Sequence, residues 1–313
     1  MFFEGNEKKV EVIVAPEAGS LRERGVAFWT GLVEVAGAKI LSTLKSSSCD
    51  AYLLSESSLF VWDDRFTMIT CGQTTLVKAV EAFLRSCSPS DIKSLIYERK
   101  NEYFPQLQKS DFFQDARDLS EKLKGKALQF GNSDEHHLQL YSFNQNFVPP
   151  ANDFTLEILM YDLQGVARDV LAATDQSISQ IRAQTGVDKI FDGFEVDDFL
   201  FEPYGYSLNA LRGDDYYTIH VTPQDVGTYV SFETNVNLQQ SIEPTVKQVL
   251  EVFKPRRFDI VVFSPVPLEK ISNVEGFSVK NHVETHLNSG YFVSFSHYYS
   301  PNEKPSEPME VEI

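Results

Sequence analysis

The sequence has few of the features that mark secreted, membrane or nucleic-acid-binding proteins. Its 313 residues include only three cysteines, at positions 49, 71 and 87, and no CxxC pair. An odd count without an export signal predicts reduced thiols in the cytoplasm. Basic residues are also scarce, since 28 Lys and Arg stand against 45 Asp and Glu and the formal net charge is −17. Nucleic-acid binding over a broad face and adsorption to an anionic membrane both need clustered positive charge, so neither is expected. An acidic field would still attract a cationic substrate.

No uninterrupted apolar run approaches the roughly 20 residues that a membrane-spanning helix needs. The longest candidate, residues 26–41, is interrupted by Glu34 and Lys39. The first eight residues, MFFEGNEK, lack a basic stretch followed by an apolar core, so no signal peptide is predicted. The composition, 42% hydrophobic and 23% charged, is that of a folded globular chain.

Common nucleotide and metal motifs are missing too. The sequence has no GxGxxG, no GxxxxGK followed by Ser or Thr, and no HExxH. His282 and His286 would share one face of a helix, but no third ligand accompanies them. A polar helix turn or loop is therefore the better interpretation, and no metal site is predicted. The segment GYSLN at residues 205–209 begins like the nucleophile elbow of hydrolases, yet Asn209 stands where the last glycine belongs.

Strand-like and helix-like stretches are interleaved along the chain. Strands are predicted at residues 9–14, 50–62, 65–71, 95–99, 138–143, 154–161, 215–221, 228–234, 258–263 and 291–298. Helices are predicted at residues 21–44, as one long helix or two, and at 74–87, 112–123, 178–185 and 242–253. Hairpins around residues 63–64 and 223–227 indicate antiparallel sheet covered by helices, which is an α+β layered sandwich. Because no Pro/Ser-rich linker divides the halves, residues 1–300 are predicted to form one domain, followed by an acidic flexible tail at 301–313.

One segment is unusual on physical grounds. Residues 53–61, LLSESSLFV, place Ser-Glu-Ser-Ser inside an otherwise apolar strand. Taken alone, such an interruption is most often an exposed face or a β-bulge. The motifs that surround it suggest another interpretation.

Six separated motifs, in one order, resemble those of the eukaryotic-type S-adenosylmethionine decarboxylases. They are FFEGNEK at residues 2–8, LSESSLFV at 54–61, TCG at 70–72, FEPYGYS at 201–207, TIHVTP at 218–223 and SFETN at 231–235. Each is weak by itself, but together they cover nearly the whole chain. The resemblance implies a four-layer αββα sandwich of two similar halves, with two antiparallel sheets inside and helices outside.

The resemblance also implies a reaction. Family members are proenzymes that cut themselves at a Glu-Ser bond, which here joins Glu56 and Ser57 and would divide the molecule into a β chain (1–56) and an α chain (57–313). Ser57 would become a pyruvoyl group, the cofactor. Decarboxylating an amino acid needs an electron sink conjugated to the α-carbon, which no ordinary side chain supplies. The pyruvoyl group would supply it through a Schiff base with S-adenosylmethionine, and the product would serve spermidine and spermine synthesis.

The same resemblance assigns roles to individual residues. His220 would be the base of self-processing with Ser207 beside it, and Cys71 would return a proton to the substrate. Without the resemblance, a hydrogen-bonded core histidine and a small buried cysteine are more common. The other matches are Phe3 and Phe201 as stacking aromatics, Leu54 as a backbone contact, and Glu4, Glu7 and Glu56 as acids at the site. Gln224 replaces a ribose-binding glutamate and so loses the bidentate acceptor, for which the adjacent Asp225 is a candidate substitute.

A second acidic group lies apart from the predicted reaction centre. Its members match acidic residues that bind or sense putrescine in animal relatives: Glu11, Asp153, Glu157 and Glu233. Asp153, Thr155 and Glu157 alternate and are predicted to share one face of a strand, so Thr155 belongs to the same predicted network. Buried carboxylates need protonation or counter-charges, yet Ile69 takes the place of a lysine in the animal pattern. The sequence therefore predicts a charge network. It leaves open whether putrescine is an effector and whether the chain is a monomer or a homodimer.

Two other functions stay open at this stage. The change to Gln224 leaves room for the same pyruvoyl chemistry on another amino acid, such as ornithine or arginine. A non-catalytic regulatory paralogue is the other candidate, although Ser57, Cys71, Ser207 and His220 are all intact.

Overall fold

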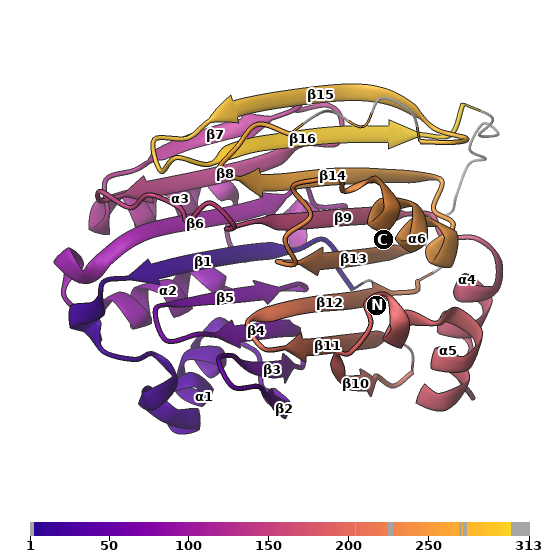
Figure 1. Cartoon of the computed structure of the whole chain (residues 1–313), viewed down its shortest axis with the longest axis horizontal. Helices are drawn as coiled ribbons and strands as arrows, with labels where there is room; N and C mark the ends of the chain where they lie inside the picture. Colours follow the sequence, from indigo (N-terminus) through magenta and orange to yellow (C-terminus); the bar gives the residue numbers. More distant parts are fainter. Residues whose placement is uncertain (1–2, 204, 225–227, 269–270, 272–273, 302–313) are drawn as a thin grey trace.

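A computed structural model describes residues 3–203, 205–224, 228–268, 271 and 274–301. Phe2, Asp225, part of the predicted turn at 223–227 and the tail after residue 301 lie outside the described residues. Two eight-stranded antiparallel sheets dominate the structure (Figure 1).

Each half of the chain forms one sheet and its covering helices. The first sheet contains β1 (Lys8–Val14), β2 (Ile40–Lys45), β3 (Asp50–Leu54), β4 (Ser57–Val61), β5 (Arg65–Thr70), β6 (Ile92–Lys100), β7 (Lys126–Phe130) and β8 (Leu138–Asn144). The second contains β9 (Thr155–Tyr161), β10 (Glu195–Leu200), β11 (Tyr206–Arg212), β12 (Asp215–Thr222), β13 (Tyr229–Thr234), β14 (Arg257–Ser264), β15 (Ser278–His286) and β16 (Phe292–Tyr299). The described helices are α1 (Gly25–Ala36), α2 (Leu76–Leu84), α3 (Phe112–Lys122), α4 (Gly165–Ala172), α5 (Ile178–Thr185) and α6 (Glu243–Phe253).

The two sheets have the same strand order. The first runs β2-β3-β4-β5-β1-β6-β8-β7 and the second β10-β11-β12-β13-β9-β14-β16-β15, so each strand has a counterpart eight strands later. The predicted α+β sandwich of two similar halves is confirmed. One consequence concerns the site, because β4, which begins at Ser57, and β12, which carries His220, are counterparts in the two sheets.

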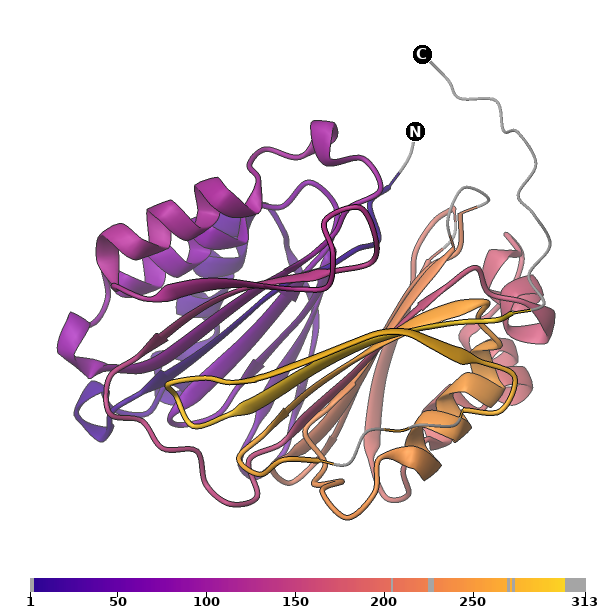
Figure 2. The same cartoon turned by 90° about the horizontal axis from the view of Figure 1, so that it is seen from above.

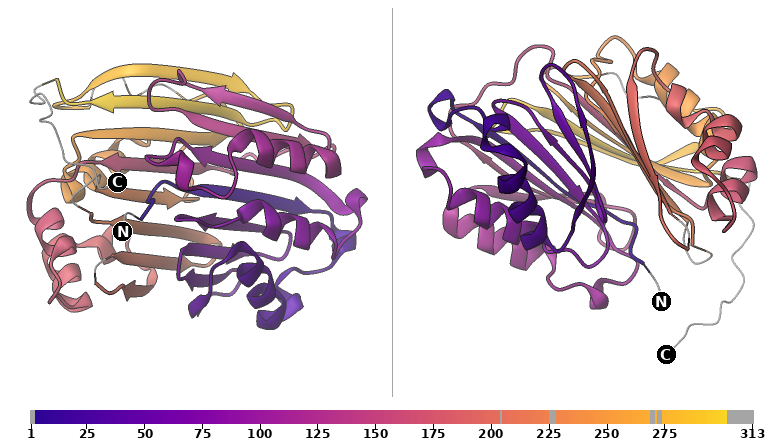
Figure 3. Two further views of the ribbon diagram at one scale, coloured as in Figure 1. Left: turned by 180° about the vertical axis from the view of Figure 1, so that it is seen from behind. Right: turned by 90° about the horizontal axis from the view of Figure 1, so that it is seen from below.

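The sheets face each other and the helices lie outside, as seen from above (Figure 2). Views from behind and below show α1–α3 against the first sheet and α4–α6 against the second (Figure 3). Alternation along the strands produces this layering. In β1, Val10, Val12 and Val14 pack with Trp29 of α1 in the core between the first sheet and its helices, called the outer core below. Lys9 and Glu11 alternate with these valines and therefore point to the space between the sheets.

The space between the sheets is apolar at its two sides and polar in the middle. One apolar cluster joins β6–β8 to β9, β14 and β16, and another joins β3 and β4 to β11 and β12. Charged and hydroxyl side chains of the central strands lie between these clusters. The fold thus holds polar groups in a buried layer, where unpaired charge is costly.

Two predictions of local structure were wrong in ways that matter for the site. The helix predicted at 21–44 ends at Ala36, because Gly37 adopts a left-handed φ of 91° and the chain turns into β2. The single strand predicted at 50–62 is a hairpin, β3 and β4, whose turn is Ser55-Glu56. Sequence patterns also missed β7, β10, β11, β15 and α4, and His282 and His286 lie in β15 rather than in a helix or loop.

None of the described helices is long and apolar enough to cross a membrane.

Candidate active site

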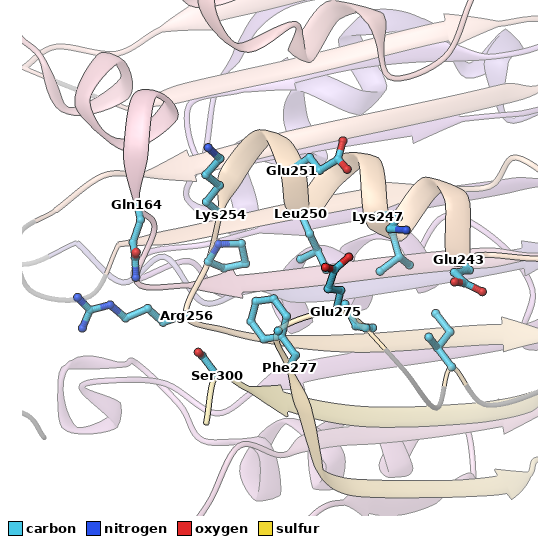
Figure 4. A pocket seen from close by; sticks show the side chains of 15 residues that line it. Gln164, Glu243, Lys247, Leu250, Glu251, Lys254, Arg256, Glu275, Phe277 and Ser300 are labelled. Atoms are coloured by element: carbon cyan, nitrogen blue, oxygen red, sulfur yellow. The ribbon is translucent and has the colours of Figure 1, made fainter. Parts of the chain in front are cut away.

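A hollow of about 540 Å³ beside α6 contains none of the predicted site residues (Figure 4). Its described lining combines apolar side chains, such as Leu250 and Phe277, with charged ones, such as Lys254 and Glu251. No histidine or cysteine is among the residues that the structure places there. The candidate site is instead a cavity of about 340 Å³ at the β3–β4 turn, lined by both halves of the chain.

The backbone at Ser57 is strained. Its φ of 131° lies in a region that L-amino acids other than glycine rarely adopt. The residue is 2% exposed, and its Oγ has no hydrogen-bond partner among the described residues. Leaving a buried hydroxyl unpaired costs free energy, so this residue combines strain with an unsatisfied nucleophilic oxygen.

The carbonyl oxygen of Glu56 is held by Cys71. The Cys71 backbone N–H donates to it at 2.9 Å and the Cys71 Sγ lies 3.3 Å away as a second donor. Burial raises the pKa of the Cys71 thiol well above its usual range, with the nearby Glu56 and Glu7 carboxyls adding to the effect. The thiol therefore stays protonated at neutral pH, and two donors point at the carbonyl next to Ser57.

His220 approaches the same cavity from β12. The register of β11 and β12 places His220 opposite Ser207, and the His220 Nδ1 lies 2.8 Å from Ser207 Oγ. On the other side of the ring, Nε2 lies 2.9 Å from Thr218 Oγ1 and 3.2 Å from Ser58 Oγ. Burial lowers the pKa of His220 to about 3, so the imidazole is neutral at physiological pH and can accept a proton.

Two aromatic side chains, Phe3 and Phe201, line the cavity. The packing of Phe3 requires a glycine at position 72, in the TCG turn. Gly72 has a φ of 63°, and a Cβ there would lie 2.9 Å from Glu56 Oε2 and 3.0 Å from the Phe3 ring. The small turn residue thus lets the Phe3 ring and the Glu56 carboxyl enter the cavity together.

The structure gathers eight of the predicted site residues around this cavity: Phe3, Glu56, Ser57, Cys71, Phe201, Ser207, His220 and Gln224. Gln224 uses its amide oxygen to accept the Phe3 backbone N–H at 3.1 Å, so it tethers the N-terminal segment. Glu4 and Leu54 are not among the described residues that line the cavity. The Glu4 carboxylate accepts the Phe104 N–H at 3.0 Å. The Leu54 side chain packs in the outer core, and the predicted backbone contact of this residue stays a prediction.

Comparison with known proteins identifies the family. The family model for adenosylmethionine decarboxylase matches residues 1–299. The chain belongs to the adenosylmethionine decarboxylase family. The S-adenosylmethionine decarboxylase proenzyme of Leishmania donovani is 33% identical over 279 residues, 83% of this chain and 73% of that protein. The proenzyme of Xenopus laevis is 34% identical over 279 residues, 84% and 83% respectively. A crystal structure of a Trypanosoma brucei AdoMetDC-delta26 monomer has a TM-score of 0.62 at 25% identity, covering 77% of this chain and 98% of that one.

In this member of the adenosylmethionine decarboxylase family, the second acidic group is joined by a lysine. Glu157 of β9 and Glu233 of β13 are directly opposed across the sheet, where like charges repel. Lys9, reaching over from the first sheet, lies 2.6 Å from Glu157 and 3.1 Å from Glu233. Burial alone would lower the pKa of Lys9, but these carboxylates raise it well above its usual range, so the ammonium is retained.

The rest of the predicted charge network lies closer to the surface. Arg65 pairs with Asp153 through two bonds of 3.1 and 3.0 Å, and Glu11 is 3.8 Å from the same guanidinium. Glu11, Asp153 and Thr155 line a polar pocket of about 260 Å³. Asp153 precedes β9 rather than lying within the strand with Thr155 and Glu157. The predicted acidic residues are thus brought together, with Lys9 and Arg65 as counter-charges.

Sequence reasoning missed Lys9, Arg65, Ser58, Asn209 and Thr218 as members of these networks. In β1, Lys9 pairs directly with Ile69, the position at which the animal pattern has its lysine. The signal was therefore present as a basic residue at an inward-facing position of the neighbouring strand. No such signal marks Asn209, whose partner Ser58 is 151 residues away.

Glu7 lies between the cavity and the charge network and provides a test of the buried electrostatics. Its carboxylate accepts the Ser231 hydroxyl at 2.7 Å, and burial raises its pKa from 4.5 to about 8. Between these two pH values the folded chain binds a proton that the unfolded chain has released, so Glu7 lowers the stability of the fold as pH rises.

We expect Glu7→Gln to have the same melting temperature as the unmodified protein near pH 4.5 and a higher one near pH 8.5. Differential scanning calorimetry across this range checks it, and a difference that is independent of pH would contradict it.

Proposed function

We propose that this chain is a proenzyme that cuts itself between Glu56 and Ser57 and then decarboxylates S-adenosylmethionine. The observation that carries the proposal is the strained Ser57, whose buried, unpaired Oγ adjoins a Glu56 carbonyl held by two donors of Cys71. The family membership supports the same function. The product would be the aminopropyl donor for spermidine and spermine synthesis.

We assign residues of the cavity to the steps of the cut. Ser57 Oγ would attack the Glu56 carbonyl carbon while the Cys71 N–H and S–H stabilise the charge that develops on the oxygen. The C–N bond breaks, the nitrogen takes a proton, and an ester replaces the amide. His220 would then remove the Ser57 α-proton. The electron pair breaks the bond between Cβ and Oγ of Ser57 and expels the main-chain carboxylate of Glu56, which leaves a dehydroalanine at residue 57. Addition of water releases ammonia and leaves a pyruvoyl group at residue 57.

The cavity fits this group and a cationic nucleoside. The pyruvoyl group, once formed, supplies the electron sink for decarboxylation. Phe3 and Phe201 offer aromatic faces to a flat base and a sulfonium. Burial raises the pKa of Glu56 to about 7, while the charge of Lys8 opposes the shift, so its carboxyl is partly ionised near neutrality. Burial keeps the Cys71 thiol protonated, and this thiol would deliver a proton to a substrate in the same cavity.

Intact mass spectrometry tests the proposal. The purified protein should consist of two fragments that divide between Glu56 and Ser57. Their masses should sum to that of the chain plus water minus ammonia, whereas simple proteolysis adds water alone. Release of ¹⁴CO₂ should occur with carboxyl-labelled S-adenosylmethionine and not with ornithine or arginine. One uncut 35.5 kDa species would contradict self-cleavage, and turnover of ornithine or arginine instead would contradict the substrate.

We also propose that the charge network makes the activity independent of putrescine. A diamine would stabilise opposed carboxylates by bringing two ammonium groups. Here Lys9 already lies between Glu157 and Glu233, and Arg65 already pairs with Asp153. Glu98 is a third carboxyl near Lys9, at 3.8 Å. Burial and the neighbouring Glu157 raise the pKa of Glu98 well above its usual range, so this carboxyl is protonated and needs no counter-charge.

Lys9→Met should therefore make full activity depend on putrescine, which the unmodified enzyme does not need. Removing one partner of a buried ion pair destabilises by about 3–5 kcal/mol, so we expect a lower melting temperature and a lower basal turnover, both partly restored by millimolar putrescine. Turnover of the unmodified enzyme should change little with putrescine. Lys126→Met, which removes an exposed lysine of β7, is the matched control and should behave like the unmodified enzyme. Strong putrescine activation of the unmodified enzyme would contradict the proposal.

A further inference from the structure

Behind His220, on the side away from Ser207, three buried polar residues from both sheets meet. Ser58 comes from β4, Asn209 from β11 and Thr218 from β12. The Asn209 amide oxygen accepts the Ser58 hydroxyl at 2.6 Å and the Thr218 hydroxyl at 2.9 Å. Both hydroxyl oxygens also lie within hydrogen-bonding distance of His220 Nε2, at 3.2 and 2.9 Å.

The hydrogens of this cluster determine which nitrogen of His220 is protonated. A hydroxyl has one hydrogen to give, so a hydroxyl that donates to Asn209 presents only lone pairs to Nε2. Thr218 has a further acceptor in the Leu208 carbonyl at 2.9 Å, which likewise directs its hydrogen away from the ring. Nε2 must then carry the ring hydrogen. Nδ1, 2.8 Å from Ser207 Oγ, is left with its lone pair.

We propose that Asn209 is a positioning residue that sets the tautomer of His220. Its amide oxygen takes the hydrogen of Ser58, and this leaves Nδ1 as the basic atom on the cavity side. Asn209 does not line the cavity, so it acts through His220 rather than on the reacting atoms. The inference deepens the proposed self-cleavage and rests on it.

The opposite rotation of the amide makes the inference falsifiable. Asn209 Nδ2 has no partner among the described residues. Were the amide turned around, Nδ2 would donate to both hydroxyls, Ser58 would give its hydrogen to Nε2, and the ring hydrogen would move to Nδ1. An ionised carboxylate at this position can only accept hydrogen bonds and therefore preserves the proposed tautomer. An apolar side chain can neither accept nor donate, so it frees the Ser58 hydroxyl to donate to Nε2 and reverse the tautomer. Asn209→Asp and Asn209→Leu are nearly isosteric with asparagine and provide these two cases.

The tautomer can be read without any cleavage. In an uncleavable Ser57→Ala background, ¹⁵N-histidine NMR should show hydrogen on Nε2 of His220, with the resonance assigned by its loss in a His220→Asn variant. Adding Asn209→Asp should leave the tautomer unchanged, whereas Asn209→Leu should move the hydrogen to Nδ1. Hydrogen on Nδ1 without any change at Asn209, or no response to Asn209→Leu, would overturn the inference.

Self-cleavage provides the second measurement. During cell-free synthesis, appearance of the two fragments should proceed with Asn209→Asp at a rate near that of the unmodified chain. It should slow by about 10² or more with Asn209→Leu, the scale of losing a correctly oriented base. Equal slowing of both variants would indicate a structural role and overturn the inference. If the unmodified chain does not cleave at all, the proposed function fails, while the tautomer measurement still judges the role of Asn209.

Discussion

Ser57→Ala should leave the molecule as one 35.5 kDa polypeptide and abolish decarboxylation. The variant keeps the fold, because the lost hydroxyl has no hydrogen-bond partner among the described residues. It removes the nucleophile that attacks the Glu56 carbonyl, so neither the ester nor the dehydroalanine that precedes the pyruvoyl group can form. We expect a loss of at least about 10³-fold in turnover, since enzymes accelerate reactions by about 10⁶-fold or more and the electron sink is absent. A denaturing gel and a ¹⁴CO₂ assay measure the two effects.

Ser55→Ala is the matched control for this variant. Ser55 lies in the same turn, but its hydroxyl accepts the Lys39 backbone N–H at 3.0 Å and has no place in the proposed cut. Cleavage should therefore go on in the control. A Ser57→Ala protein that still divides into two fragments at this bond would show that another residue or another protease makes the cut.

His220→Asn should uncouple the first half of the cut from the second. Ester formation at Ser57 depends on Cys71, which the substitution leaves in place, whereas removal of the α-proton depends on the ring. We expect mature fragments to form about 10²–10⁴-fold more slowly, the usual contribution of a positioned base. Hydroxylamine, which cleaves esters but not amides, should cut the accumulated chain after Glu56. The masses of the resulting fragments identify the bond.

The control for His220→Asn is His286→Ala, because His286 is an exposed residue of β15 far along the chain from the site. It should self-cleave at the normal rate. Because burial lowers the pKa of His220 to about 3, protonation of this ring should not slow cleavage between pH 8 and pH 5. A rate that falls with a midpoint near 6.5 and is flat in His220→Asn would contradict the buried neutral imidazole.

Much of the fold follows from local pattern. The alternation of Val10, Val12 and Val14 identifies β1 and its outward face, and the same pattern places Lys9 and Glu11 inward. The motifs around Ser57, Cys71 and His220 identified the family. Pattern failed where a strand was short or polar, as in β10 and β15, and where one glycine ended a helix, as at Gly37.

The sequence by itself therefore determined the family and, through the alternation of each strand, which side chains share one face of a sheet. Only the tertiary structure decided how those side chains pair. Lys9 and Glu157 are separated by 148 residues, and Ser58 and Asn209 by 151, so nothing local connects them. The alternation of side chains along a strand predicts on which face of the sheet each residue lies. It does not predict which residue of the other sheet lies opposite. The facing of the two sheets makes those pairs, and with them the counter-charge of the acidic network and the hydrogen bonds that orient His220.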